Sequence, residues 1–134
     1  MGTEVDLDFL AARAWKAREN AYAKYSHFAV GAALATSSGE IFVGCNVENA
    51  SFGLTICAER VAVSSAIVAG HREFEAIAVA AETEEPVVPC GACRQFLAEF
   101  NRSMRVCCIG RGGASRTVLL SDLLPSPFSS FAGS

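Results

Sequence analysis

The sequence lacks a cluster of basic residues and a long apolar run. Lys and Arg number 11 against 14 Asp and Glu, which gives a net charge of −3, and Arg13, Lys16 and Arg18 are scattered rather than massed. Nucleic-acid binding normally needs a basic face, so we expect neither DNA nor RNA as a partner. Every apolar stretch is interrupted well before the roughly 20 residues that a membrane span requires. We therefore expect no membrane partner either.

A targeting pattern is also missing from the start of the chain. No signal peptide precedes the six cysteines, and the myristoylation-like start Met1-Gly2 carries Asp6 where Ser or Thr is required. This argues against a secreted disulfide framework, so we expect a cytoplasmic protein whose thiols are reduced or bound to metal. The length fits one domain, which we assign to residues 1–128. Residues 129–134 are expected to form a short disordered tail.

Two short stretches of the sequence carry its recognisable chemistry. Cys57 and the pair Cys90 and Cys93 each stand where a helix is predicted to begin, and free backbone N–H groups there favour thiolates. Thiolates are good zinc ligands, and three of them leave a tetrahedral ion one open position, as in catalytic zinc sites. Glu59 follows Cys57 by two residues and is close enough to act on a water molecule in that position. The pattern predicts a metal-assisted hydrolase.

The order of these motifs matches a known group of enzymes. Cys57-Ala58-Glu59 followed by Pro89-Cys90-Gly91-Ala92-Cys93 resembles the zinc nucleoside and nucleobase deaminases. The stretches 44–51 (GCNVENAS) and 25–28 (YSHF) narrow the resemblance to the small cytidine deaminases, over residues from about 21 to about 128. The resemblance implies one Zn²⁺ per chain, held by Cys57, Cys90 and Cys93. It also implies a homotetramer whose sites are completed by neighbouring subunits.

The same resemblance implies the reaction and the roles of several residues. Cytidine and deoxycytidine would be hydrolysed to uridine and deoxyuridine with release of ammonia, a step of pyrimidine salvage. Glu59 would take the proton of the attacking water and then pass protons to N3 and to the departing amine. Asn46 and Glu48, two residues apart on one predicted strand, would hold the ribose. Phe28 would lie against the pyrimidine ring.

Several further residues are candidates for supporting roles. Backbone groups near Ala58 and Cys90 would read the edge of the base. Phe128 would reach a neighbouring subunit's site. Arg60 or Arg94 could donate hydrogen bonds to the sulfur atoms, and the resemblance favours Arg60.

Other interpretations of the cysteines remain open at this point. Cys45 could be a fourth ligand, which would close the zinc site and make it structural. A redox Cys-x-x-Cys protein would leave the Cys57 motif without a role. The chain could also deaminate another small aminopyrimidine, such as a nucleoside antibiotic. His27 and His71 are isolated from the metal motif and are not expected to be ligands.

The hydrophobic pattern predicts a three-layer α/β/α sandwich with a mixed sheet of about five strands. Strand, helix and strand over residues 74–109 form a βαβ unit, which should be parallel and right-handed. A hairpin turning at 37–39 precedes it and makes the sheet mixed. The predicted helices span 6–22, 57–69, 91–100 and 119–124, and the predicted strands span 28–35, 40–47, 74–81, 105–109 and 116–120.

Overall fold

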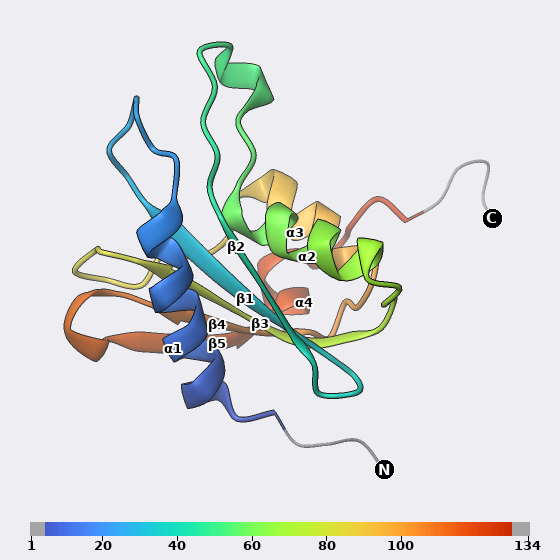
Figure 1. The fold of residues 1–134 in the computed structure, drawn as a ribbon. Helices are drawn as coiled ribbons and strands as arrows, with labels where there is room; N and C mark the ends of the chain where they lie inside the picture. Colours follow the sequence, from blue (N-terminus) through green and yellow to red (C-terminus); the bar gives the residue numbers. More distant parts are fainter. Residues whose placement is uncertain (1–4, 130–134) are drawn as a thin grey trace.

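One mixed sheet lies between two layers of helices in the computed structural model, which describes residues 5–129 (Figure 1). The strand order is β2-β1-β3-β4-β5, with β3 and β4 parallel and every other neighbouring pair antiparallel. The strands are β1 (Val30–Thr36), β2 (Ile41–Cys45), β3 (Phe74–Ala81), β4 (Arg105–Ile109) and β5 (Ser115–Leu119). The predicted α/β/α sandwich, its five strands and its parallel βαβ unit are confirmed.

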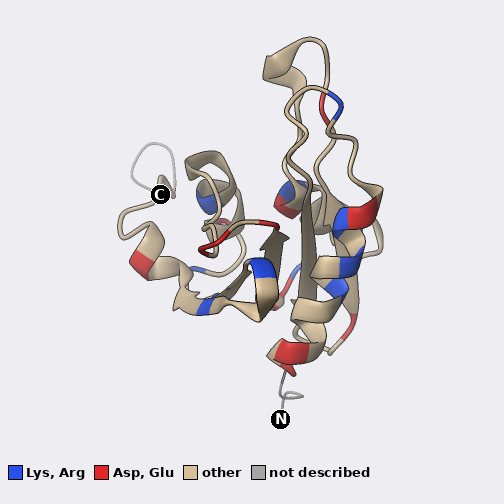
Figure 2. Ribbon diagram, turned by 90° about the vertical axis from the view of Figure 1, so that its left-hand side faces the viewer, with Lys and Arg blue, Asp and Glu red and all other residues tan. Residues whose placement is uncertain are grey.

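Helices cover both faces of this sheet (Figure 1). One face carries α1 (Leu7–Ala17), whose start is capped by the Asp6 carboxylate accepting from the backbone N–H groups of Asp8 and Phe9 at 3.0 and 3.1 Å. The other face carries α2 (Ala58–Val68), α3 (Gly91–Ala98) and the short α4 (Leu120–Leu123). The acidic residues of α1 lie near its start and the basic ones toward its end, which complements the helix dipole (Figure 2).

The two faces of the sheet differ in side-chain size. Toward α1 the central strands present small residues, among them Ala33, Ala78 and Ala80, which pack with Leu10 and Ala14 of the helix. Toward α2 they present larger ones, including Leu34, Ile77 and Val79. The small residues let α1 approach the sheet closely, while the larger ones fill the space beneath α2 and α3. Burial on both faces is why these strands read as continuous apolar runs.

Several predicted boundaries extend too far. The helix expected over 6–22 ends at Ala17 and continues only as a 3₁₀ turn, Arg18–Asn20, because Tyr22 pairs with Val47 instead. The helix expected over 91–100 ends at Ala98, and the strand expected over 40–47 ends at Cys45. Only Ser129 of the predicted tail lies within the described residues.

Gly31 is the tightest point between α1 and the sheet. A Cβ atom there would lie 2.0 Å from the carbonyl oxygen of Ala14 and 2.5 Å from the backbone nitrogen of Arg18. We expect Gly31→Ala to lower the free energy of unfolding in urea by about 3 kcal/mol or more, since backbone atoms must move to relieve the overlap. Gly91→Ala, whose Cβ would meet nothing within 4 Å, is the control. Equal stability of the two variants would contradict this packing.

Two loops project beyond one end of the sheet and together form a structure that we call the arm, residues 21–29 and 46–57 (Figure 1). Val47 pairs with Tyr22 on one side and with Ile56 on the other. The rings of Tyr25 and Phe52 meet edge to face, with centroids 5.9 Å apart. The two loops therefore support each other rather than extend the sheet. Within residues 5–129, no helix has the length and apolar character needed to cross a membrane.

Candidate active site

The N-termini of α2 and α3 meet and bring three cysteines together. Cys57 and Cys90 are the N-cap residues of their helices, and Cys93 lies in the first turn of α3. Their sulfur atoms all lie within 4.8 Å of one another, and those of Cys57 and Cys90 are 3.9 Å apart. Both helix ends direct unpaired backbone N–H groups and positive dipole ends toward this cluster.

This geometry fits a zinc ion. Tetrahedral zinc with Zn–S bonds of about 2.3 Å separates its sulfur ligands by about 3.8 Å, close to the distance between Cys57 and Cys90. Among the described residues 5–129 the cluster has no fourth Cys, His, Asp or Glu. Three protein ligands leave a coordination position open for water, as a catalytic zinc site requires.

The electrostatics of the cluster favour a cation. Hydrogen bonding from the Cys93 thiol is the main cause that lowers the pKa of Cys57 to about 5, and Arg60 adds to it. The same pairing, together with burial, raises the pKa of Cys93. One thiolate therefore forms readily, whereas a second needs a compensating positive charge. A divalent metal ion supplies that charge and displaces the remaining protons.

Arg60 is the arginine that contacts the cluster. Its Nη2 lies 3.8 Å from the sulfur of Cys57 and also donates to the carbonyl of Thr55 at 3.4 Å. Arg94 instead donates to the carbonyls of Pro89 and Leu123, at 2.7 and 3.0 Å. Arg60 is thus the nearer of the two to a cluster sulfur, and its role in offsetting thiolate charge stays a prediction.

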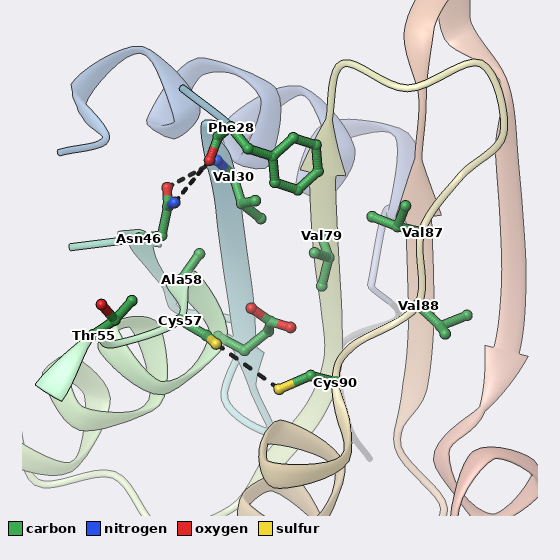
Figure 3. A pocket seen from close by; sticks show the side chains of 11 residues that line it. Phe28, Val30, Asn46, Thr55, Cys57, Ala58, Val79, Val87, Val88 and Cys90 are labelled. Carbon is green, nitrogen blue, oxygen red and sulfur yellow. Dashed lines mark hydrogen bonds between the residues drawn. The ribbon is translucent and has the colours of Figure 1, made fainter. Parts of the chain in front are cut away.

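A cavity of about 260 Å³ opens beside the cysteine cluster (Figure 3). Figure 3 shows the ring of Phe28 at one end and the sulfur atoms of Cys57 and Cys90 facing each other at the other. Its walls are largely apolar and are formed by Phe28, Val30, Asn46, Thr55, Cys57, Ala58, Glu59, Val79, Val87, Val88 and Cys90. A mainly apolar cavity with a few polar groups in its walls suits a flat heterocyclic ring.

Glu59 is the buried carboxyl group of this cavity. The residue is 4% exposed although it belongs to the first turn of α2. Burial is the main cause that raises its pKa to about 7, and the negative charge of Cys57 acts in the same direction. A carboxyl group with a pKa near neutrality can both accept and return a proton, which general acid–base catalysis requires.

Asn46 and Glu48 are not arranged as the sequence predicted. Because β2 ends at Cys45, both residues follow the strand instead of sharing one of its faces. The Asn46 side chain is nearly buried, accepting from the N–H of Val30 at 2.9 Å and donating to the carbonyl of Phe28 at 2.8 Å (Figure 3). It thus anchors the backbone around Phe28 and lines the cavity at the same time.

Glu48 lines a neighbouring hollow with Tyr25, Ser26, Phe52 and Thr55. Its carboxylate accepts from the N–H groups of Tyr25 and Ser26, at 2.8 and 3.0 Å, and from the Ser26 hydroxyl. Thr55 lines both spaces, so Glu48 lies next to the cavity rather than in it. Contact of Asn46 and Glu48 with a ribose stays a prediction. Asn46 would use the amide donor and acceptor sites left free by its bonds to Val30 and Phe28, and Glu48 the carboxylate acceptor sites left free by its bonds to Tyr25 and Ser26.

The bonds of Glu48 give a pH-dependent prediction. Hydrogen bonds from Ser26 lower the pKa of Glu48. The ionised carboxylate therefore stabilises the loop 21–29 fully at pH values above the ordinary Glu pKa of about 4.3. This stabilisation is lost as the pH falls through the lowered pKa of Glu48. We expect Glu48→Gln to speed amide hydrogen exchange at Tyr25 and Ser26 several-fold at neutral pH. In the wild type, the Tyr25 and Ser26 amides should lose their protection only at acidic pH, when their exchange rates are compared with those of an unstructured peptide at the same pH. Glu73→Gln is the control, and equal protection in both variants would contradict the role of Glu48.

Other predicted residues lie away from the cavity. Phe128 is 60% exposed and does not line it, so a contact of this residue in its own chain's cavity is not observed. Cys45 is outside the cysteine cluster, and His71 pairs with Glu40 at 2.9 Å. Cys107 and Cys108 are buried in β4, as small apolar residues would be.

Sequence reasoning missed several residues that shape the site. Ser26 holds Glu48, and Val87 and Val88 form a wall of the cavity. The only available signal was position, since Ser26 lies in the quoted 25–28 stretch and the two valines directly precede Pro89. Position in the sequence does not show which residues Ser26, Val87 and Val88 contact in the folded chain.

The three-layer sandwich gathers three cysteine sulfurs into one cluster and places a buried glutamate in the cavity that two of these cysteines line. These features define a site of the hydrolytic zinc deaminase class. Comparison with known proteins specifies the family. Residues 5–109 match the family described as cytidine and deoxycytidylate deaminase zinc-binding region. The chain belongs to this family.

Individual relatives agree with that assignment. The chain is 49% identical over 126 residues to a cytidine deaminase of Sporosarcina psychrophila, covering 93% of each chain. It is 45% identical over 117 residues to a probable cytidine deaminase of Dictyostelium discoideum, covering 87% of this chain and 79% of the relative. The crystal structure of cytidine deaminase from Burkholderia pseudomallei superimposes with a TM-score of 0.90 at 50% identity, covering 92% of this chain and all (100%) of that one.

Proposed function

We propose that this chain catalyses the zinc-dependent hydrolytic deamination of cytidine and deoxycytidine, yielding uridine or deoxyuridine and ammonia, as a cytoplasmic enzyme of pyrimidine salvage. The observation that carries the proposal is the buried carboxyl of Glu59, which lines one cavity with Cys57 and Cys90, two members of the cluster that Cys93 completes. A structural zinc module would need a fourth ligand and would give a buried, protonatable glutamate no purpose.

Cys57, Cys90 and Cys93 would hold the zinc ion, with Arg60 offsetting part of the thiolate charge. When bound, zinc supplies the Lewis acidity that makes water nucleophilic at neutral pH. Glu59 accepts a proton from the attacking water, as a C–O bond forms at C4 of the pyrimidine, and delivers it to N3. It then carries the second proton to the amine, the C4–N4 bond breaks and ammonia leaves. Atoms balance as cytidine plus water giving uridine plus ammonia.

The cavity walls orient the substrate for this attack. Phe28 lies against the pyrimidine ring, and backbone groups near Ala58 and Cys90 read its edge. Asn46 and Glu48 hold the ribose from the cavity and from the neighbouring hollow. The apolar walls exclude bulk water, so that other water molecules do not compete with the attacking one.

The assembly proposed is a homotetramer in which Phe128 reaches a neighbouring site. Supporting it, Phe52 and Leu54 of the arm and Val68 of α2 are 73%, 65% and 89% exposed. Ile56, Val61 and Val68 line a hollow along α2. Contiguous exposed apolar surface is typical of surfaces that a partner covers. Sedimentation of the pure chain tests the assembly, and a single-chain mass would contradict it.

The reaction is tested by ultraviolet absorbance of cytidine incubated with zinc-replete protein, with deoxycytidine, free cytosine and an aminopyrimidine nucleoside antibiotic as parallel substrates. Loss of the cytidine and deoxycytidine bands is expected. Turnover of only the antibiotic would show that cytidine and deoxycytidine are not the substrates, while the proposed deamination reaction would still stand. No turnover of any of the four by fully zinc-loaded protein would contradict the proposed function.

A further inference from the structure

The hydroxyl of Ser26 joins two residues of the proposed substrate site. Its Oγ donates to Oε2 of Glu48 and accepts from the backbone N–H of Phe28 at 3.0 Å. The direction of both bonds is fixed, because an ionised carboxylate only accepts and an amide N–H only donates. The three groups form an unbroken chain, from N–H to O–H to carboxylate, in which each bond polarises the next. A change at Glu48 therefore affects the bond at Phe28.

Phe28 is held at both of its backbone polar groups. Ser26 accepts from its N–H, and the side-chain amide of Asn46 donates to its carbonyl at 2.8 Å (Figure 3). Asn46 and Glu48 are the two residues proposed to bind the ribose. One of them holds Phe28 directly and the other holds it through Ser26. The proposed sugar contacts and the ring at the end of the cavity therefore belong to one hydrogen-bonded unit.

The acceptor sites of Glu48 show where a sugar hydroxyl would bind. Its Oε1 accepts from the backbone N–H groups of Tyr25 and Ser26, at 2.8 and 3.0 Å, and these two bonds occupy the lone pairs of that oxygen. Within residues 5–129, its Oε2 accepts only from the Ser26 hydroxyl. A sugar hydroxyl would therefore share Oε2 with Ser26, at the end of the chain of bonds that leads to Phe28.

The backbone between Ser26 and Phe28 is strained. His27 takes a φ of 58°, the only positive φ of a non-glycine residue in the part of the chain that the structure describes. In this turn the N–H of His27 bonds to the carbonyl of Ala23 at 2.9 Å, and the N–H of Phe28 points back to Ser26. Such strain persists only where surrounding bonds over-determine it, and it is concentrated at sites that hold a ligand. The turn is therefore shaped around the bond between Ser26 and Phe28.

We propose that Ser26 is a positioning residue, whose hydroxyl couples the binding of the sugar at Glu48 to the placement of the Phe28 ring against the base. The inference rests on the proposed function, in which Glu48 holds the ribose and Phe28 lies against the pyrimidine. It adds that these two contacts depend on each other. Ser26 touches no reacting atom and acts only through its two partners.

A double-mutant cycle on cytidine kinetics tests this coupling. Ser26→Ala should raise KM about three- to tenfold with kcat little changed, since the lost bonds support substrate equally in the ground and transition states. Ser26→Thr keeps the hydroxyl at this exposed position and should restore the wild-type KM. Ser26→Ala should cause no further loss when added to Glu48→Ala, because the sugar contact is then already gone. An equal loss in both backgrounds, or a fall in kcat without a change in KM, would overturn the proposal.

Hydrogen exchange reads the coupling without activity. In zinc-loaded protein, Ser26→Ala should speed exchange of the Phe28 amide several-fold, because the acceptor of that amide is removed. Glu48→Ala should have a similar effect without touching Phe28, because the Ser26 hydroxyl loses the partner that orients it. Ser103→Ala, the same truncation in an exposed turn outside the arm, is the matched control and should leave this amide unchanged. Unchanged exchange of the Phe28 amide in Glu48→Ala would overturn the proposal.

Failure of the proposed function gives a different result. Absence of cytidine turnover by the zinc-loaded wild type would contradict the proposed function. The exchange rate of the Phe28 amide in Glu48→Ala would still decide whether Ser26 couples these two residues.

Discussion

Glu59→Ala should bind zinc as the wild type does and yet deaminate cytidine about 10²–10⁴ times more slowly, or slower still. The reason is that Glu59 is the buried carboxyl that lines the cavity beside the cysteine cluster, and its pKa of about 7 lets it move protons in both directions. Glu59 is not a member of the cluster that holds the metal. The measurements are zinc content per chain and the rate of loss of the cytidine absorbance band.

Truncating a buried residue also removes packing, so a second variant separates the two effects. Glu59→Gln keeps the size of the side chain and its place in the first turn of α2 but cannot take up a proton. We expect it to unfold at nearly the wild-type urea concentration and to be as slow as Glu59→Ala. Near-normal turnover by either variant would refute the assignment of Glu59 as the proton carrier.

Cys90→Ala should lose both zinc and activity. Losing a residue that only hydrogen-bonds a metal ligand typically weakens metal affinity about 10–100-fold. Losing one of the three ligands themselves should therefore weaken zinc binding by about two orders of magnitude or more. Cys90 is the informative choice because its side chain is exposed, whereas Cys93 is fully buried and its truncation would leave a cavity. Metal analysis after dialysis and the cytidine assay measure the two effects.

Cys45→Ala is the matched control for this experiment. Cys45 lies at the end of β2, outside the cluster, and should be dispensable for zinc content and for turnover. Loss of zinc from Cys45→Ala would revive the interpretation in which this residue closes the metal site. A zinc-replete and active Cys90→Ala would show that Cys90 is not a ligand.

Regions governed by local pattern were predicted well. The strands 74–81 and 105–109 are found at the predicted bounds, because a run of apolar, β-branched and small residues buried on both faces has few alternatives. The turn at 37–39 is also present, with Gly39 at a φ of 90°, which a glycine adopts without strain. Asp6 and Gly70 mark helix ends as their residue types suggest.

Prediction failed where distant segments compete for the same backbone groups. Beyond Cys45 the chain still alternates like a strand, but the N–H and carbonyl of Val47 bond to Ile56 rather than to β1. On the other side β1 begins only at Val30, because His27 takes a φ of 58° and the Asn46 side chain occupies the N–H of Val30. These interactions join segments that are distant in the sequence. The hydrophobic pattern of each segment by itself therefore does not predict them.

The sequence by itself determined the chemistry of this protein. Spacing and residue type predicted three thiol ligands and one catalytic carboxyl group, because a Cys-x-Glu and a Cys-x-x-Cys at helix starts are visible as local patterns. Their convergence and the near-neutral pKa of Glu59 were decided only by the tertiary structure. Distances between α2 and α3, and the removal of Glu59 from water, arise when both helices pack on one sheet. The support of Phe28 by Asn46, and of Ser26 by Glu48, depends on the same long-range packing and has no counterpart in local sequence.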